Sequence, residues 1–178
     1  EEPFGVGYTL EAANIVIGAN GNINADGQGF GARSGPGAGD IIGNGHYRGG
    51  GYGGNAALRN NVSGKGAPYG TPAMPTALGS GAGSTTSGAG GGALKLSALN
   101  TIVDGTLSAD GADGPENHIF GGSGGSIWIV SGTLQGEGVI AARGGMNKSG
   151  WCGSGGGRID ISGVVNNFTG DIIVSRNN

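Results

Sequence analysis

The chain has 178 residues, 12% of which are charged, and its net charge is −3. No cluster of Lys and Arg is present, which removes the electrostatic basis for nucleic-acid binding, and no apolar run approaches the length of a membrane span. Glycine supplies 46 residues. Glycine at this level without any periodic pattern is typical of disordered chains, so the pattern of the other residues decides the fold class.

Apolar residues alternate with other residues in four segments of the chain, and glycine-rich segments separate them. The alternation has a period of two residues, which is the period of a β-strand and differs from that of a helix. Glycine flanks each segment, where it permits tight corners. In chain order, the alternating segments are 8–27, 92–111, 125–144 and 157–174. We therefore expect strands in these four segments and no helix.

A heptapeptide of the form G-x-[I/L]-x-A-x-G occurs three times. Its copies occupy 21–27, 105–111 and 138–144. Another apolar residue precedes the Ile or Leu of each copy by 13 positions, at Leu10, Leu94 and Ile127, and a degraded fourth pair, Ile159 and Ile172, has the same spacing. Such a repeated spacing indicates units that stack and cover one another's apolar side.

These repeats predict an all-β fold, a parallel β-helix (β-solenoid) of about four coils with long glycine-rich loops, in a single domain over residues 1–178. Equivalent residues of successive coils should then lie directly above one another. The later repeats follow each other after 32–33 residues. The two columns predicted to be buried are Leu94–Ile127–Ile159 and Leu107–Ile140–Ile172.

The G-G-x-I-x-I strands, the heptapeptides and the long glycine loops together resemble the Gly-rich right-handed parallel β-helix domains of secreted and surface proteins, which share the pectin-lyase-like architecture. The resemblance covers about 92–174 well and 8–27 in part. It implies a β-helix, but that family includes adhesive stalks, structural repeats and polysaccharide-degrading enzymes, so it does not choose a function.

A glycine-rich insertion at about 28–91 separates the first coil from the second. Within it, residues 43–54 contain His46, Tyr47, Arg48 and Tyr52 among glycines. Three interpretations are open: a flexible surface loop, glycine segments packed in the manner of polyproline II, and a face whose aromatic side chains bind a sugar or a protein. We expect backbone hydrogen bonds to order most of the insertion.

Three carboxylates at three-residue spacing, Asp110, Asp113 and Glu116, lie in one glycine-rich loop. Carboxylate oxygens on a flexible loop suit Ca²⁺, which is the one cofactor that the sequence suggests. The spacing matches neither an EF-hand loop nor the glycine-rich nonapeptide calcium repeat, and an ordinary solvated turn is the alternative. Asp110 and Arg143 share one heptapeptide position in adjacent coils, so we also expect a surface ion pair between them.

A carbohydrate-binding or polysaccharide-degrading β-helix is the competing functional interpretation. Lyases need a basic residue beside acidic groups, and glycosidases need paired carboxylates. The ionisable residues expected on the outer strand faces are Glu11, Lys95 and Asp160, and the last two share a column with Trp128. Because that row is mixed and has no carboxylate pair, we predict a protein that is not an enzyme.

The polar composition is typical of an exported protein. Cys152, next to Trp151, is the single cysteine, so no disulfide can form within the chain. Three N-x-[S/T] sequons are candidate glycosylation sites, at Asn61, Asn147 and Asn167. The sequence does not begin with Met, and we expect a processed chain whose export signal has been removed. The expected location is extracellular or at the cell surface.

The ends of the repeat pattern carry no capping helix, although repeat proteins need caps to remain soluble monomers. Exposed strand edges favour head-to-tail pairing, which produces an open filament. We therefore predict a self-assembling filament subunit or an adhesive stalk module, whose partners are copies of itself and surface glycans. The residues expected to make the contact are Tyr8, Ile15, Ile17, Ile159, Ile172 and Val174.

Overall fold

The computed structural model describes Gly5 and residues 7–43, 46–56, 66–116, 119–149, 153–163 and 165–175. These residues form an all-β structure in which no helix occurs. The strands are β1 (Tyr8–Ile17), β2 (Asn22–Asn24), β3 (Ile41–Gly43), β4 (His46–Tyr47), β5 (Ala93–Val103), β6 (Thr106–Ser108), β7 (Ser126–Gly136), β8 (Val139–Ala141), β9 (Arg158–Ser162), β10 (Val165–Phe168) and β11 (Asp171–Ile173). β3 and β4 form a short antiparallel pair inside the insertion.

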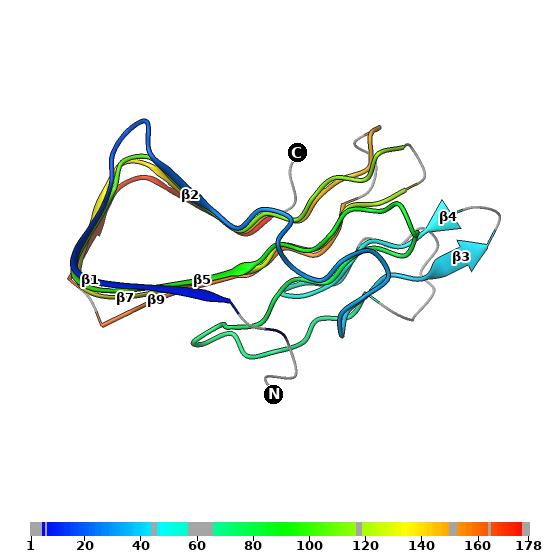
Figure 1. Ribbon diagram of the computed structural model, residues 1–178, viewed down its shortest axis with the longest axis horizontal. Helices are drawn as coiled ribbons and strands as arrows, with labels where there is room; N and C mark the ends of the chain where they lie inside the picture. The colour runs from blue at the N-terminus through cyan, green and yellow to red at the C-terminus, as the bar shows by residue number, and fades with distance from the viewer. Residues whose placement is uncertain are drawn as a thin grey trace.

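Two all-parallel sheets stack the repeats in sequence order. One sheet has the order β1-β5-β7-β10, with β9 also paired to β7, and the other has the order β11-β8-β6-β2. We call the four repeats layers: β1 and β2 form layer 1, β5 and β6 layer 2, β7 and β8 layer 3, and β9 to β11 layer 4. Figure 1 shows the long strands of successive layers following the same path. This arrangement is consistent with the predicted parallel β-solenoid.

Both predicted columns are confirmed as paired positions. Leu94 is in register with Ile127 and Ile127 with Ile159, and in the other sheet Leu107, Ile140 and Ile172 align in the same way. Adjacent strands lie about 4.8 Å apart, so aligned side chains cover one another. Ile127 and Ile140 are fully buried in the core between the two sheets, whereas Ile159 is partly buried and Ile172 is 48% exposed. The outer layer thus covers its neighbour without being covered itself.

Layer 1 departs from the predicted register. The sequence spacing aligns Leu10 with Leu94, but the structure pairs Tyr8 with Leu94 and Leu10 with Leu96. The reason is a longer turn: Ile17 pairs with Val103 and Asn22 with Thr106, so layer 1 has two more residues than layer 2 between its strands. The extra residues form a turn closed by the Gly21 N–H, which donates to the Gly18 carbonyl at 2.6 Å.

Glycine-rich segments form the other side of the layers. We call the described parts of 28–40, 48–54, 79–92, 111–125 and 142–157 the glycine bundle. Figure 1 shows them as extended traces continuing from the sheets. Backbone hydrogen bonds join segments that are far apart in the sequence: the Gly50 N–H donates to Gly121, and the Gly53 N–H donates to Gly156. The expectation that such bonds order the insertion is confirmed for its described residues.

Hydrogen bonding in the glycine bundle repeats every three residues. Four consecutive N–H groups, at 122–125, show the pattern. Their acceptors, in order, are the carbonyl oxygens of Ala112, Ser80, Gly155 and Ala109. Three successive donors therefore reach three different segments, and the fourth returns to the first. A polyproline II helix has three residues per turn, whereas a strand alternates with a period of two. The insertion has the same spacing: the Gly88 and Gly91 N–H groups, three residues apart, donate to Phe120 and Ser123 of one neighbouring segment. Packing of the bundle in the manner of polyproline II is the second of the three interpretations of the insertion.

The close approach of these segments requires glycine. A Cβ at Gly90 would lie 2.0 Å from the Gly79 carbonyl oxygen, and one at Gly122 would lie 2.0 Å from the Ala89 carbonyl oxygen. Both contacts are with backbone, which cannot rotate away as a side chain can. By contrast, a Cβ at Gly31, on the edge of the same bundle, would meet no atom within 4 Å. Glycine is therefore a packing requirement in the interior of the bundle.

Candidate functional site

The outer sides of layers 1 and 4 expose apolar residues. All but two positions of β1 are exposed, and Tyr8 is 73% exposed. At the other end of the stack, Val165 of β10 is 60% exposed and Ile172 of β11 is 48% exposed. β1 and β10 lie at the two ends of one sheet, and β2 and β11 at the two ends of the other. Within the described residues, both ends of the stack therefore present open strand edges with apolar side chains.

The residues predicted to make an end-to-end contact are placed unequally. Tyr8, Ile172 and Val174 are exposed, Ile15 and Ile159 are partly buried, and Ile17 is buried within the core. Two further residues of β1 are exposed and were not expected at the contact from the sequence, Leu10 at 40% and Val16 at 65%. The period-two pattern marks Leu10 as facing inward, and it is the end position of layer 1 that leaves its side chain accessible.

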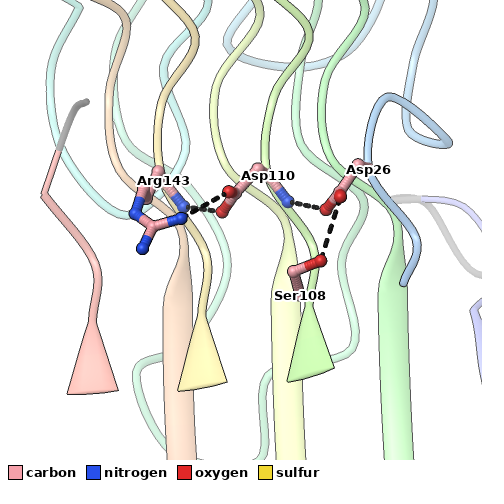
Figure 2. Close-up of polar contacts among 4 residues, drawn as sticks. All are labelled: Asp26, Ser108, Asp110 and Arg143. Carbon is pink, nitrogen blue, oxygen red and sulfur yellow. Dashed lines mark hydrogen bonds and ion pairs between the residues drawn. The ribbon is translucent and has the colours of Figure 1, made fainter. Parts of the chain in front are cut away.

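A ladder of aspartates links the same heptapeptide position in three layers (Figure 2). Asp26 accepts hydrogen bonds from the Asp110 N–H at 2.7 Å and from the Ser108 hydroxyl at 2.9 Å. Asp110 in turn accepts from the Arg143 N–H at 2.6 Å, and its other oxygen lies 3.1 Å from the Arg143 guanidinium. The predicted ion pair is confirmed, and Asp26, which the sequence analysis missed, extends it. Each carboxylate thus fastens one layer to the next.

Burial raises the pKa of Asp110 above its ordinary value, the Arg143 N–H and guanidinium act in the opposite direction, and the Asp26 carboxylate adds to the rise. The folded protein therefore holds a proton on Asp110 more readily than the unfolded chain does. Protonated Asp110 therefore stabilises the folded protein at acid pH. This stabilisation is lost as the pH rises from about 4, the ordinary pKa of an aspartate, through the raised pKa of the folded state.

Asp110→Asn should remove this acid-favoured contribution and keep an oxygen that accepts the Arg143 N–H. We expect the stability of the wild type relative to the variant to fall as the pH rises from 3 to 6, as measured by urea unfolding. Asp113→Asn is the matched control, because Asp113 is exposed and also accepts a backbone N–H one layer on, that of Met146 at 2.8 Å. A difference between wild type and Asp110→Asn that stays constant over this pH range would contradict the assignment.

The three carboxylates suggested as calcium ligands do not gather into one cluster. Asp110 faces Arg143, Asp113 binds the Met146 N–H, and Glu116 is exposed. Across the described part of the chain, no group of three or more His, Cys, Asp or Glu residues is arranged to hold a metal ion. The separation arises because stacking directs Asp110 and Asp113 along the axis of the stack, each to its own partner in the following loop.

The outer row expected from the sequence is present on the long sheet. Thr9, Lys95, Trp128 and Asp160 are aligned in register. The Lys95 ammonium lies 4.0 Å from the centre of the Trp128 ring, a cation–π contact that covers one face of the indole. The Asp160 carboxylate accepts the Met74 N–H at 3.2 Å. A hollow of about 70 Å³ beside Tyr8 and Lys95 is well below the roughly 300 Å³ of the smallest ordinary ligand pockets.

One aromatic residue of the insertion, Tyr52, is buried against the stack, and Tyr69 packs beside it half-buried. Tyr52 is fully buried, and its hydroxyl lies 2.7 Å from the Ser126 hydroxyl of β7. Its ring packs at 4.8 Å from that of Tyr69, whose hydroxyl accepts from Ser80 at 2.9 Å. Arg48 is 2% exposed and forms an ion pair with Asp40 at 3.4 Å. The interpretation of 43–54 as a binding face is wrong for Tyr52 and Arg48, which are buried: Tyr52 joins the insertion to β7, and Arg48 pairs with Asp40 within the insertion.

The candidate glycosylation sites have different surroundings. Asn147 is 6% exposed, whereas Asn167 lies on β10 and is exposed. Asn61 lies outside the described residues, as do Trp151 and Cys152. Attachment of a glycan stays a prediction for these sequons, and the accessible acceptor among the described residues is Asn167.

Comparisons with known proteins do not assign the chain to a family. No protein-family model, curated protein or solved structure matches it. In the described residues, no helix is long and apolar enough to cross a membrane.

Proposed function

We propose that this chain is a structural module, outside the cell or at its surface, that stacks end to end with copies of itself into a filament or stalk. It is a β-solenoid of about four coils, with the right-handed parallel β-helix architecture that its sequence resembles. The observation that carries the proposal is the pair of open edges. Tyr8 and Leu10 at one end, and Val165 and Ile172 at the other, are 40–73% exposed.

The physical chemistry of strand edges supports this function. An edge strand has unpaired N–H and C=O groups and is a template for pairing with another chain. Burying apolar surface at the same contact contributes about 25 cal/mol per Å². The two ends differ, so the contact is heterologous and does not close, and repetition of it yields a fibre. The low charge of the chain, 12% of residues, limits repulsion between copies.

Ile172→Lys should weaken this association by about tenfold or more, because the contact would bury an unpaired charge. Leu99→Lys is the matched control: Leu99 is also an exposed apolar residue, at 69%, but it lies on β5, which is paired on both edges. Sedimentation velocity over a range of concentrations, with negative-stain electron microscopy, measures the effect. The wild type and Leu99→Lys should form linear multimers, and Ile172→Lys should stay monomeric.

Two results would count against the proposal. One is a wild-type chain that remains monomeric at the highest soluble concentration. The other is equal assembly of the Ile172→Lys and Leu99→Lys variants, which would place the contact elsewhere on the molecule.

A further inference from the structure

The way in which the layers align inside one chain can be extended from the last layer of one copy to the first layer of another. Each layer pairs with the next in parallel, and two columns of aligned positions are apolar in all four layers. One column runs through Tyr8, Leu94, Ile127 and Ile159. Another runs through Ile23, Leu107, Ile140 and Ile172. Both columns therefore begin in layer 1 and end in layer 4, and each could continue into a second copy.

We infer that the contact between copies continues both columns in register, with layer 4 of one copy against layer 1 of the next. Ile159 then pairs with Tyr8 of the next copy, Ile161 with Leu10, and Ile172 with Ile23. This inference rests on the proposed end-to-end assembly and specifies its polarity and its register. Layer 1 of the second copy would then take the place of a fifth layer in the stack of the first.

The side chains of β9 and β11 fit this register against those of β1 and β2. Three pairs of apolar residues meet on the inner side. On the outer side, Asp171 would face Asn22 of the next copy, Asp160 would face Thr9, and Ser162 would face Glu11, so no two like charges lie directly opposite in these pairs. Like charges directly opposite one another in adjacent strands are destabilising. A slip by one residue would instead turn the inner apolar residues toward the outer face.

The aspartate ladder supports the same polarity. In layers 2 and 3, the N–H groups of Asp110 and Arg143 are bound by a side-chain oxygen from the preceding layer. The equivalent N–H in layer 1 belongs to Asp26. The equivalent side chain in layer 4 is Ser175, two residues beyond the aligned pair Ala141 and Ile173. The Ser175 hydroxyl is an acceptor, so layer 4 supplies what the Asp26 N–H of the next copy requires.

The longer turn of layer 1 does not oppose this contact. Between layers 1 and 2, the register of the long strands differs by two residues from that of the short strands, and the stack accommodates it. At the contact with another copy, this turn can likewise extend outward, because β1 and β2 on either side of it each keep their own register with the neighbouring layer.

Engineered cysteines test the register directly. Asp171 and Asn22 are exposed and outward of the core columns. In a Cys152→Ser background, Asp171→Cys with Asn22→Cys places the two sulfurs in adjacent, aligned positions, with Cα atoms about 5 Å apart, which suits a disulfide. The control pair is Asp171→Cys with Asn24→Cys. A two-residue offset separates those Cα atoms by about 8 Å, beyond the range of a disulfide.

Mild oxidation should convert the first pair into a ladder of covalent multimers on non-reducing gels, and the second pair should yield at least about tenfold less multimer. Both reduced proteins should melt as the Cys152→Ser parent does, which shows that they fold. A ladder from the control pair and not from the aligned pair would overturn the register. Efficient dimers from Asp171→Cys alone would overturn the head-to-tail polarity.

The outcome also separates this inference from the proposed function. If neither pair forms multimers while the parent assembles in sedimentation experiments, the register is wrong and the assembly stands. If neither pair forms multimers and the parent is monomeric at every concentration, both the assembly and the register are rejected.

Discussion

Gly90→Ala should destabilise the protein by about 3 kcal/mol or more, because the added methyl group would overlap the backbone of a neighbouring segment. The added Cβ would lie 2.0 Å from the Gly79 oxygen and 2.1 Å from its carbonyl carbon. Relief of that overlap requires two segments of the glycine bundle to move apart. The Gly90 N–H bond to Phe30 and the Gly29 N–H bond to Gly90 would then be stretched or lost.

Gly31→Ala is the control for the change of residue type. Gly31 lies in the same bundle, and a Cβ at this position would meet no atom within 4 Å. Loss of backbone freedom in the unfolded chain should make this variant neutral or more stable by about 0.4–1 kcal/mol. Thermal and urea unfolding of both variants measure the difference. Equal stability of Gly90→Ala and Gly31→Ala would show that the bundle is not packed as the structure has it.

Ile140→Ala should lower the free energy of unfolding by about 2–5 kcal/mol, the usual cost of a cavity in a core. Ile140 is fully buried between Leu107 and Ile172 in its column. The layers above and below are tied to it by the parallel sheet, so the cavity cannot close by a shift of one strand.

Ile172→Ala makes the same chemical change at the next position of the same column. Because Ile172 is 48% exposed, we expect a loss of about 1 kcal/mol or less when the protein is dilute enough to be monomeric. Urea unfolding at low protein concentration makes the comparison. A loss at Ile172 as large as that at Ile140 would mean that layer 4 is covered in solution.

The sheets could be predicted because their information is local and repeated. Leu94, Ile127 and Ile159 lie 32–33 residues apart, and a parallel stack converts that spacing directly into register. The pairing of Asp110 with Arg143 followed from the same step. The register of layer 1 could not be predicted in this way, because two additional residues in a turn leave the strand pattern unchanged and shift only the alignment between layers.

The path of the insertion was beyond prediction for a different reason. Glycine has no side chain to mark an inner and an outer face, so its three-residue hydrogen-bonding pattern leaves no trace in the order of residues. The contacts that fix the insertion also join distant positions: the Tyr52 and Ser126 hydroxyls are 74 residues apart in the sequence. No pattern within a short window identifies Ser126 as the partner of Tyr52, and both residues become significant only once the layers are stacked.

The glycine bundle also has a consequence at the level of the gene. Every nucleotide change in a glycine codon that alters the amino acid introduces a side chain, and at positions such as Gly90 and Gly122 that side chain would meet backbone at 2.0 Å. Selection should therefore remove most changes in the bundle, while exposed positions on the inner strands of the stack, such as Leu99 and Gln135, remain open to drift. Over time, such a protein would diversify on its sheet faces and keep its glycine-rich half almost unchanged.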